Sequence, residues 1–327
     1  MSTKTTFTQE KLMTRSFLTL LMFVGMVGLS STLSAQEKYA IQPRFEPGKY
    51  VQTLVMDNDM VMRVGNGDAE EGIPMKQEQK QKFLLEVSQP DDKGTQKVEM
   101  AFAEIKMFQA MMGMEIVYDS TDEDNQNPNL APIYNAMLGS KFTFDLTKDG
   151  KSENFKGFDE LWEKMIKSMP GGAGAVLEPM KEKMGDEMLS SLGSMDNNFG
   201  KEPRAIGEQW KETQSQTIPF LGESEIESTH TLKSVKDDIA VIATAGKIKM
   251  KGGDTIEIGP IKMDFQKGDM SITTTTSINT KTGLAVEAKS EIEMDMTAEM
   301  DVPINNSKMQ MRITNKAVST VTIEKAL

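Results

Sequence analysis

Regular alternation of charged and apolar residues near the C-terminal end is the feature that most constrains how this chain folds. The alternation runs from Leu284 to Val302. Because side chains along a β-strand point to opposite faces in turn, it predicts a long strand with one apolar and one charged face. A straight strand of this length would reach roughly 60 Å at about 3.3 Å per residue, so we expect it to bend or to be interrupted. The apolar set is Leu284, Val286, Ala288, Ile292, Met294, Met296, Ala298, Met300 and Val302, and the charged set is Glu287, Lys289, Glu291, Glu293, Asp295 and Glu299.

The same period of two recurs along most of the chain. Runs of strand length, separated by turn residues, predict antiparallel β-structure. In the second part of the chain these runs are rich in threonine and isoleucine, whose branched side chains suit a pleated surface. Strands are expected at residues 49–55, 79–89, 96–108, 141–147, 210–218, 223–235, 238–250, 269–279, 284–300, 307–313 and 319–326.

The period changes to that of a helix between Phe158 and Asn197. A first helix is expected from Asp159 to Met169, and a second follows after Pro170 and a glycine-rich connection. Apolar residues spaced by three or four positions form one stripe along each helix, which predicts that both cover an apolar surface. The stripes are Leu161, Met165, Ile166 and Met169 in the first helix, and Leu177, Met180, Met184, Met188, Leu192 and Met195 in the second.

The two β regions on either side of these helices follow a similar order of strands and turns. We therefore predict a first β half at residues 36–157, a helical segment at 158–200 and a second β half at 201–327. Common ancestry of the halves stays open, because β-meanders resemble one another without kinship. The predicted fold is mainly β, with antiparallel curved sheets or an open half-barrel and one helical segment packed on the apolar face.

The first 35 residues have the pattern of an export signal. Basic residues precede an apolar core from Phe17 to Leu29, and small residues allow cleavage near Ala35. This core is shorter than the roughly 20 residues that span a bilayer, so we expect a periplasmic or extracellular protein without a membrane-spanning helix. No cysteine follows the core, so no lipid anchor is expected. Met13 is an alternative start residue, because it directly precedes the basic part of the signal.

Composition excludes several classes of function. The formal charge is -12 and the pI is about 4.8, with no basic run, so we do not expect a nucleic-acid partner. The chain has no cysteine and one histidine, His230, which excludes thiol nucleophiles, zinc clusters and multi-histidine metal sites. His230 lies in a strand-like stretch without a recognisable nucleophile, so a packed or surface residue is favoured over a general base. We expect no cofactor and favour a non-enzymatic function.

The 28 methionines are the most unusual part of the composition. Thioethers are soft ligands that suit Cu(I), but copper sites usually include histidine or cysteine as well. Methionine also fills irregular cores and lines adaptable apolar surfaces, which is the favoured interpretation. We predict an apolar ligand cleft lined by Met165, Met180, Met184, Met188, Met294, Met296 and Met300.

An acidic loop from Asp119 to Asn127 offers oxygen ligands of the kind that calcium takes. It lacks the glycine and the distal glutamate that the helix-loop-helix calcium motif requires. A solvated loop is therefore the favoured interpretation.

Short motifs relate the chain to a known family. Val117 to Met165 contains Tyr118-Asp119-Ser120, Leu138-Gly139, Lys148-Asp149-Gly150 and Gly157, and a later element contains Pro203, Gly207 and Trp210. These elements resemble a family of uncharacterised exported bacterial proteins known as a domain of unknown function. The resemblance implies no activity and no functional residue. Many exported relatives are lipid-anchored, whereas this chain has no cysteine to carry an anchor.

Three functions are compatible with this pattern. We favour an exported protein that binds an apolar ligand, such as a lipid or a lipid-modified partner, in the methionine-lined cleft. The alternatives are a structural or protein-interaction module of the cell envelope and a methionine-based Cu(I) site.

Overall fold

The computed structural model describes residues 37–41, 45–65, 72–128, 130–148, 150–169, 202–218, 222–252, 255–258, 261–302 and 307–326. The chain divides into two compact units, Met1–Lys38 and Tyr39–Leu327, and the large sheet belongs to the second. The predicted export signal, with its cleavage site near Ala35, lies outside the described residues. So does the predicted second helix.

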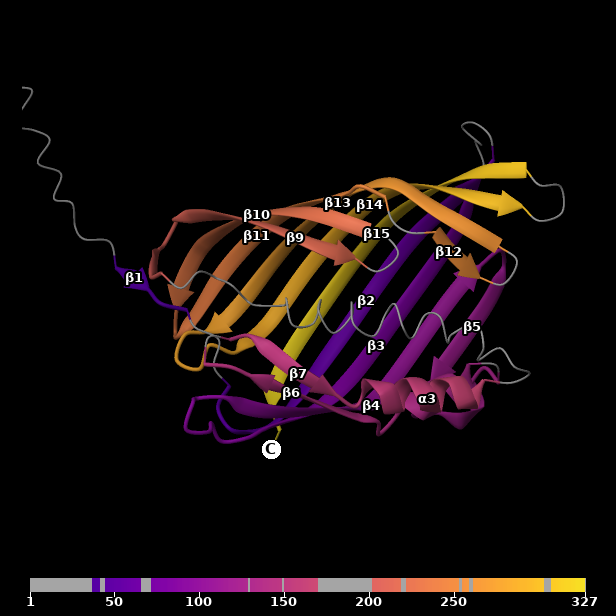
Figure 1. The fold of residues 1–327 in the computed structure, drawn as a ribbon. Helices are drawn as coiled ribbons and strands as arrows, with labels where there is room; N and C mark the ends of the chain where they lie inside the picture. Colours follow the sequence, from indigo (N-terminus) through magenta and orange to yellow (C-terminus); the bar gives the residue numbers. More distant parts are fainter. Residues whose placement is uncertain are drawn as a thin grey trace, which may run out of the picture. The chain divides into compact units, whose positions relative to one another are not determined.

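The described part of the second unit is built on one antiparallel sheet of 13 strands (Figure 1). The strand order is β7-β6-β4-β3-β2-β15-β14-β13-β11-β10-β9, with β5 paired to β4 and β12 paired to β13. The edge strands β7 and β9 do not pair with each other, so the described sheet is open. This confirms the predicted class, a mainly β protein built on an open curved antiparallel sheet.

The strands of the first part are β2 (Gly48–Val64), β3 (Ile73–Val87), β4 (Gln96–Met111), β5 (Met114–Asp119), β6 (Lys141–Leu146) and β7 (Ser152–Lys156). Those of the second part are β9 (Gln209–Ile218), β10 (Gly222–Lys236), β11 (Ile239–Met250), β12 (Thr255–Ile258), β13 (Ile261–Asn279), β14 (Ala285–Val302) and β15 (Ser307–Lys325). Two-residue strands are β1 (Lys38–Tyr39) and β8 (Arg204–Ala205), and the helices are η1 (Glu123–Asn125), α2 (Ala131–Met137) and α3 (Phe158–Ser168). No described helix is long and apolar enough to cross a bilayer.

Several strands are longer than the alternation predicts. β2 continues through Asp57, Asn58 and Asp59, residue types that are depleted in strands, because it pairs on both sides with β3 and β15. β15 is one strand through Thr314 and Lys316, where the sequence predicts a break, because β14 and β2 flank it there. β14 runs for 18 residues without interruption. Pairing on both sides thus overrides weak local preference.

The sheet curves instead of breaking, as Figure 1 shows. Register shifts occur on β13 between Phe265 and Lys267, on β10 between Leu232 and Ser234, and on the β3–β4 pair beside Phe83. Such β-bulges bend a strand and increase its local twist. The predicted bend is therefore distributed over several strands.

Helix α3 confirms the first predicted helix and identifies the apolar face of the sheet. Its residues Leu161 and Trp162 are buried, and the ring of Phe158 lies 4.9 Å from that of Phe142 on β6. The aromatic contacts continue from Phe142 through Phe102 to Phe83 on β3. We call the face of the sheet that bears these rings the inner face. Helix η1 lies within the predicted acidic loop, and α2 is a further helix for which the sequence gives no prediction.

Gly157 fixes the start of α3. Its φ is +96°, and a Cβ atom there would lie 2.4 Å from the backbone oxygen of Lys141. Only glycine combines that backbone conformation with such close approach to a neighbouring strand.

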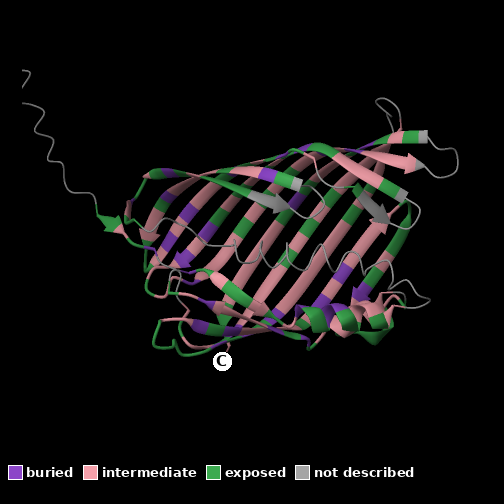
Figure 2. Ribbon diagram, in the orientation of Figure 1, coloured by how far each residue is buried: buried purple, intermediate pink, exposed green. Residues whose placement is uncertain are grey.

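Two buried clusters lie near the same end of the strands. One contains Ile41, Trp210, Leu232, Ala240, Ile242 and Ile278, and the other contains Tyr50, Phe83, Leu85, Val87, Val98, Leu146 and Leu284. Toward the other end, the central strands are mostly of intermediate burial, drawn pink in Figure 2. The division into two similar halves remains a prediction, although β2 and β15 join both parts in one sheet.

Leu232 provides a test of the first cluster. It is fully buried, so we expect Leu232→Ala to lower the free energy of unfolding by about 3 kcal/mol, through lost burial and the cavity left behind. The matched control is Leu84→Ala on β3, because Leu84 is 52% exposed and should cost less than about 1 kcal/mol. Urea denaturation measures both. Equal losses in the two variants would contradict the assigned core.

Candidate functional site

The inner face of the six central strands carries almost no charge. Residues that pair directly across the sheet share a face, so the registers define which side chains lie on it. On β2, β3, β11, β13, β14 and β15 the inner positions include no Asp, Glu, Lys or Arg except Lys325 at the end of β15. The predicted separation of apolar and charged residues on β14 is confirmed and extends over neighbouring strands.

Methionines on this face form rows that cross the strands. Met111, Met75 and Met60 pair in succession on β4, β3 and β2. In the same row Asn315 pairs with both Met60 and Met294, and Met294 pairs with Met270. The next residue in the row is Ile248 on β11. We call these residues, Met111 to Ile248, the methionine row.

A shorter row of the same kind lies nearer the other end of the strands. Met263, Met300 and Met309 pair in succession on β13, β14 and β15. Directly paired side chains have Cβ atoms about 5 Å apart, so the flexible methionine side chains in each row lie against one another. The sequence shows alternation along each strand, but the alignment across strands depends on the register.

The predicted cleft residues are only partly placed. Met294, Met296 and Met300 lie on the inner face of β14, with Met296 buried and the other two half-buried. Met165 is half-buried on α3. Met180, Met184 and Met188 lie outside the described residues. The cleft as a whole therefore remains a prediction.

A polar row lies beside the methionine row on the inner face. His230, Thr244, Thr274, Ser290 and Ser319 pair in succession from β10 to β15. Nδ1 of His230 is 2.9 Å from Oγ1 of Thr244, and Oγ1 of Thr274 is 2.9 Å from Oγ of Ser290. The row thus contains two hydrogen-bonded pairs, His230 with Thr244 and Thr274 with Ser290.

At the β9 end of this row, four side chains form a compact cluster. The ring of Trp210 stacks on that of His230, with centroids 5.2 Å apart and an angle of 22° between the planes. The guanidinium carbon of Arg204 lies 5.2 Å from the centre of the Trp210 ring, which is a cation–π contact. Oε2 of Glu212 is 3.7 Å from Nε2 of His230. We call Arg204, Trp210, Glu212 and His230 the tryptophan cluster.

Burial changes the acid–base properties of this cluster. Burial raises the pKa of Glu212, and the nearby charge of Arg204 opposes that shift. Burial lowers the pKa of His230. Both shifts favour the neutral form of the group concerned. No pattern along the sequence connects these residues, because Trp210 and His230 meet only through the pairing of β9 with β10.

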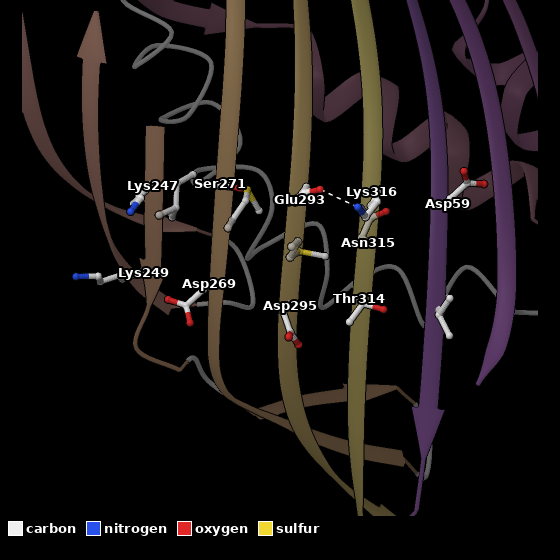
Figure 3. Close-up of a pocket in the computed structure, with 14 residues that line it drawn as sticks. Asp59, Lys247, Lys249, Asp269, Ser271, Glu293, Asp295, Thr314, Asn315 and Lys316 are labelled. Carbon is white, nitrogen blue, oxygen red and sulfur yellow. Dashed lines mark hydrogen bonds and ion pairs between the residues drawn. The ribbon is translucent and has the colours of Figure 1, made fainter. Parts of the chain in front are cut away.

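The outer face of the same strands is charged and partly ion-paired. Arg312 on β15 donates two hydrogen bonds to Asp295 on β14, of 2.9 and 2.6 Å, and these hydrogen bonds hold the pKa of Asp295 below its usual value. Lys316 donates to Glu293 at 2.8 Å. A pocket of about 670 Å³ lies at this part of the sheet, and Figure 3 shows Asp59, Glu293 and Lys316 among its lining side chains. Met270 and Met294 of the methionine row also line it, so its lining combines charged and apolar side chains.

Two carboxylates of the acidic loop, those of Asp119 and Asp122, accept hydrogen bonds from other groups of the chain. Lys106 donates to Oδ2 of Asp119 at 2.7 Å, and the backbone and hydroxyl of Thr121 donate to Oδ1 at 2.8 and 2.6 Å. Asp122 caps η1 by accepting from the backbone N–H of Asp124. Burial alone would raise the pKa of Asp119, but the hydrogen bonds from Lys106 and Thr121 outweigh it and lower that pKa to about 2.

Comparison with known proteins gives a family and weak structural likenesses. Residues 93–285 match a family described as a family of unknown function (DUF6263). No curated protein matches the sequence.

Among solved structures, one of lipid–protein interactions in lipovitellin matches with a TM-score of 0.43 and 9% identity, over 86% of this chain and 26% of that chain. The outer membrane protein OprG from Pseudomonas aeruginosa matches with a TM-score of 0.24 and 7% identity, over 88% of this chain and 100% of that chain. This chain thus spans about a quarter of the lipovitellin chain. Likenesses at these scores support no argument about function.

Asp119 predicts a pH dependence of stability. Its pKa is about 2 in the folded state and ordinarily 3.8, so its contribution is present above about pH 4 and is lost as the pH falls toward 2. We expect Asp119→Asn to lower the free energy of unfolding by about 1–2 kcal/mol at pH 7, after allowance for solvent screening. The difference from the wild type should shrink between pH 4 and 2 in urea denaturation. Asp92→Asn, in an exposed turn, is the control, and a deficit for Asp119→Asn that is constant with pH would contradict the assignment.

Proposed function

The chain belongs to a family of unknown function, DUF6263, and we propose that this member is an exported, non-enzymatic protein that binds an apolar ligand on the inner face of its sheet. The ligand class is a lipid or the lipid chain of a modified partner. The observation that supports the proposal best is the asymmetry of the sheet, with charge and ion pairs on one face and an uncharged, methionine-rich face on the other.

A sheet of this kind buries its apolar face against something. The two buried clusters lie near one end of the strands, and neither includes the methionine row. Met60, Met75, Met270 and Met294 are of intermediate burial, so each retains accessible apolar surface. Extended apolar surface on a folded protein marks a binding site for a ligand or partner.

Methionine suits a ligand of variable shape. Its unbranched side chain has three rotatable bonds and a polarisable sulfur, so a row of methionines adapts to different apolar chains. The six central strands also present inner-face glutamines and asparagines, such as Gln77, Gln79 and Asn58, which tolerate contact with water before a ligand binds. The signal-like first 35 residues support export of such a protein to the periplasm or the extracellular space.

Binding is testable with a probe that has no hydrogen-bonding group. We expect the purified protein to bind 1,6-diphenylhexatriene, with fluorescence enhancement that saturates. Replacement of Met270 and Met294 by glutamine keeps similar size but adds polar groups, and should weaken binding at least tenfold. The matched control replaces Ser271 and Thr314 by glutamine. Ser271 follows Met270 on β13, and Thr314 pairs with Asp295, which follows Met294 on β14. Both control side chains lie on the outer face.

Two results would contradict the proposal. One is wild-type protein that binds no probe and carries no lipid in native mass spectrometry after isolation from its own envelope. The other is equal loss of binding in the inner-face and outer-face variants. Circular dichroism of each variant establishes that the sheet is intact.

A further inference from the structure

The tryptophan cluster contains three buried polar atoms that have no hydrogen-bond partner among the described residues. They are Nε1 of Trp210, Nε2 of His230 and Nε of Arg204. Trp210 is only 7% exposed. Buried polar groups are almost always hydrogen-bonded, and three exceptions within one cluster call for an explanation.

The register places Trp210 and His230 on the same inner face as the methionine row, and Arg204 on β8 contacts the Trp210 ring. Trp210 pairs with His230 across β9 and β10, and Glu212 lies two residues further on the same face. In the row of His230, the residue on β13 is Thr274, four residues from Met270. With about 4.8 Å between strands and about 3.3 Å per residue, His230 and Met270 are roughly 16 Å apart along the sheet. One lipid acyl chain has a comparable length, about half of the roughly 30 Å hydrocarbon core of a bilayer.

The unpartnered atoms define the chemistry of a ligand group. The N–H groups of Trp210 Nε1 and Arg204 Nε can only donate, so they require an acceptor oxygen. Nη1 of Arg204 is already 2.8 Å from a carboxylate oxygen of Glu208, so its charge has a partner within the chain. The carboxyl group of Glu212 lies beside His230 and would repel an anion whenever it is ionised. A neutral oxygen, such as an ester carbonyl or a hydroxyl, therefore fits better than a carboxylate or phosphate.

We propose that the tryptophan cluster binds the neutral oxygen-bearing head of an amphiphile whose acyl chain lies on the methionine row. This inference rests on the proposed function and adds to it the ligand class, an acylglycerol or fatty alcohol. The donors of Trp210 and Arg204 hold the head group, and the stacked His230 ring keeps the indole in place. The polar row continues from this cluster across β11, β13, β14 and β15, from Thr244 to Ser319.

The experiment compares three probes of increasing polarity on the same protein. These are 1,6-diphenylhexatriene, monopalmitoylglycerol and palmitate, the last two measured by displacement of the first at pH 7.5. The variant combines Trp210→Phe with Arg204→Lys, which removes both N–H donors while it keeps an aromatic ring and a positive charge. We expect at least tenfold weaker binding of monopalmitoylglycerol and unchanged binding of diphenylhexatriene.

Two controls keep the test decisive if the double variant is unstable. Arg204→Lys alone removes one donor and should weaken monopalmitoylglycerol binding severalfold. Trp162→Phe makes the same aromatic change in α3, where Trp162 is also buried, and should leave both probes unaffected. Thermal denaturation of each variant separates loss of fold from loss of a head-group contact.

Each outcome decides one point. If the wild type binds diphenylhexatriene and monopalmitoylglycerol but the variants bind both unchanged, the head-group inference is overturned while the proposed function stands. Palmitate that binds tighter than monopalmitoylglycerol overturns the neutral head group. A wild type that binds none of the three overturns the proposed function itself.

Discussion

The pairing of β2 with β15 is the interaction on which the rest of the structure depends. It runs from Met311 opposite Val64 to Lys325 opposite Tyr50 and joins strands from opposite ends of the sequence into one sheet. Because side chains alternate, a slip of one residue would turn the methionines of β2 to the charged face. The uncharged inner face, and any site on it, therefore depends on this register.

The two faces stabilise the sheet by different interactions. Cross-strand ion pairs such as Arg312–Asp295 and Lys316–Glu293 lie on the outer face, where solvent makes each pair contribute little to stability. They link β14 to β15, because Lys308, Arg312 and Lys316 on β15 lie against mostly acidic positions of β14. On the inner face, the two clusters bury apolar surface near one end of the strands, whereas the central strands beyond them are mostly of intermediate burial.

Much of the fold could be predicted because alternation is a local signal. The faces of β14 and the helix over Phe158–Ser168 follow directly from residue spacing. The continuation of β2 through Asp57 and Asp59 could not be predicted, because acidic residues disfavour strands locally and only pairing on both sides compensates. The tryptophan cluster could not be predicted either, because Arg204, Trp210 and His230 come together only through the β9–β10 pairing and the short strand β8.

By itself, the sequence determined that the chain is a mainly β protein of acidic character, with an apolar and a charged set on each long strand and without cysteine chemistry. Tertiary structure alone decided which residues of different strands lie side by side. Period two assigns a side chain to a face but contains no information about its neighbour across the sheet. The methionine row and the tryptophan cluster are both products of register, so they exist only once the strands have paired.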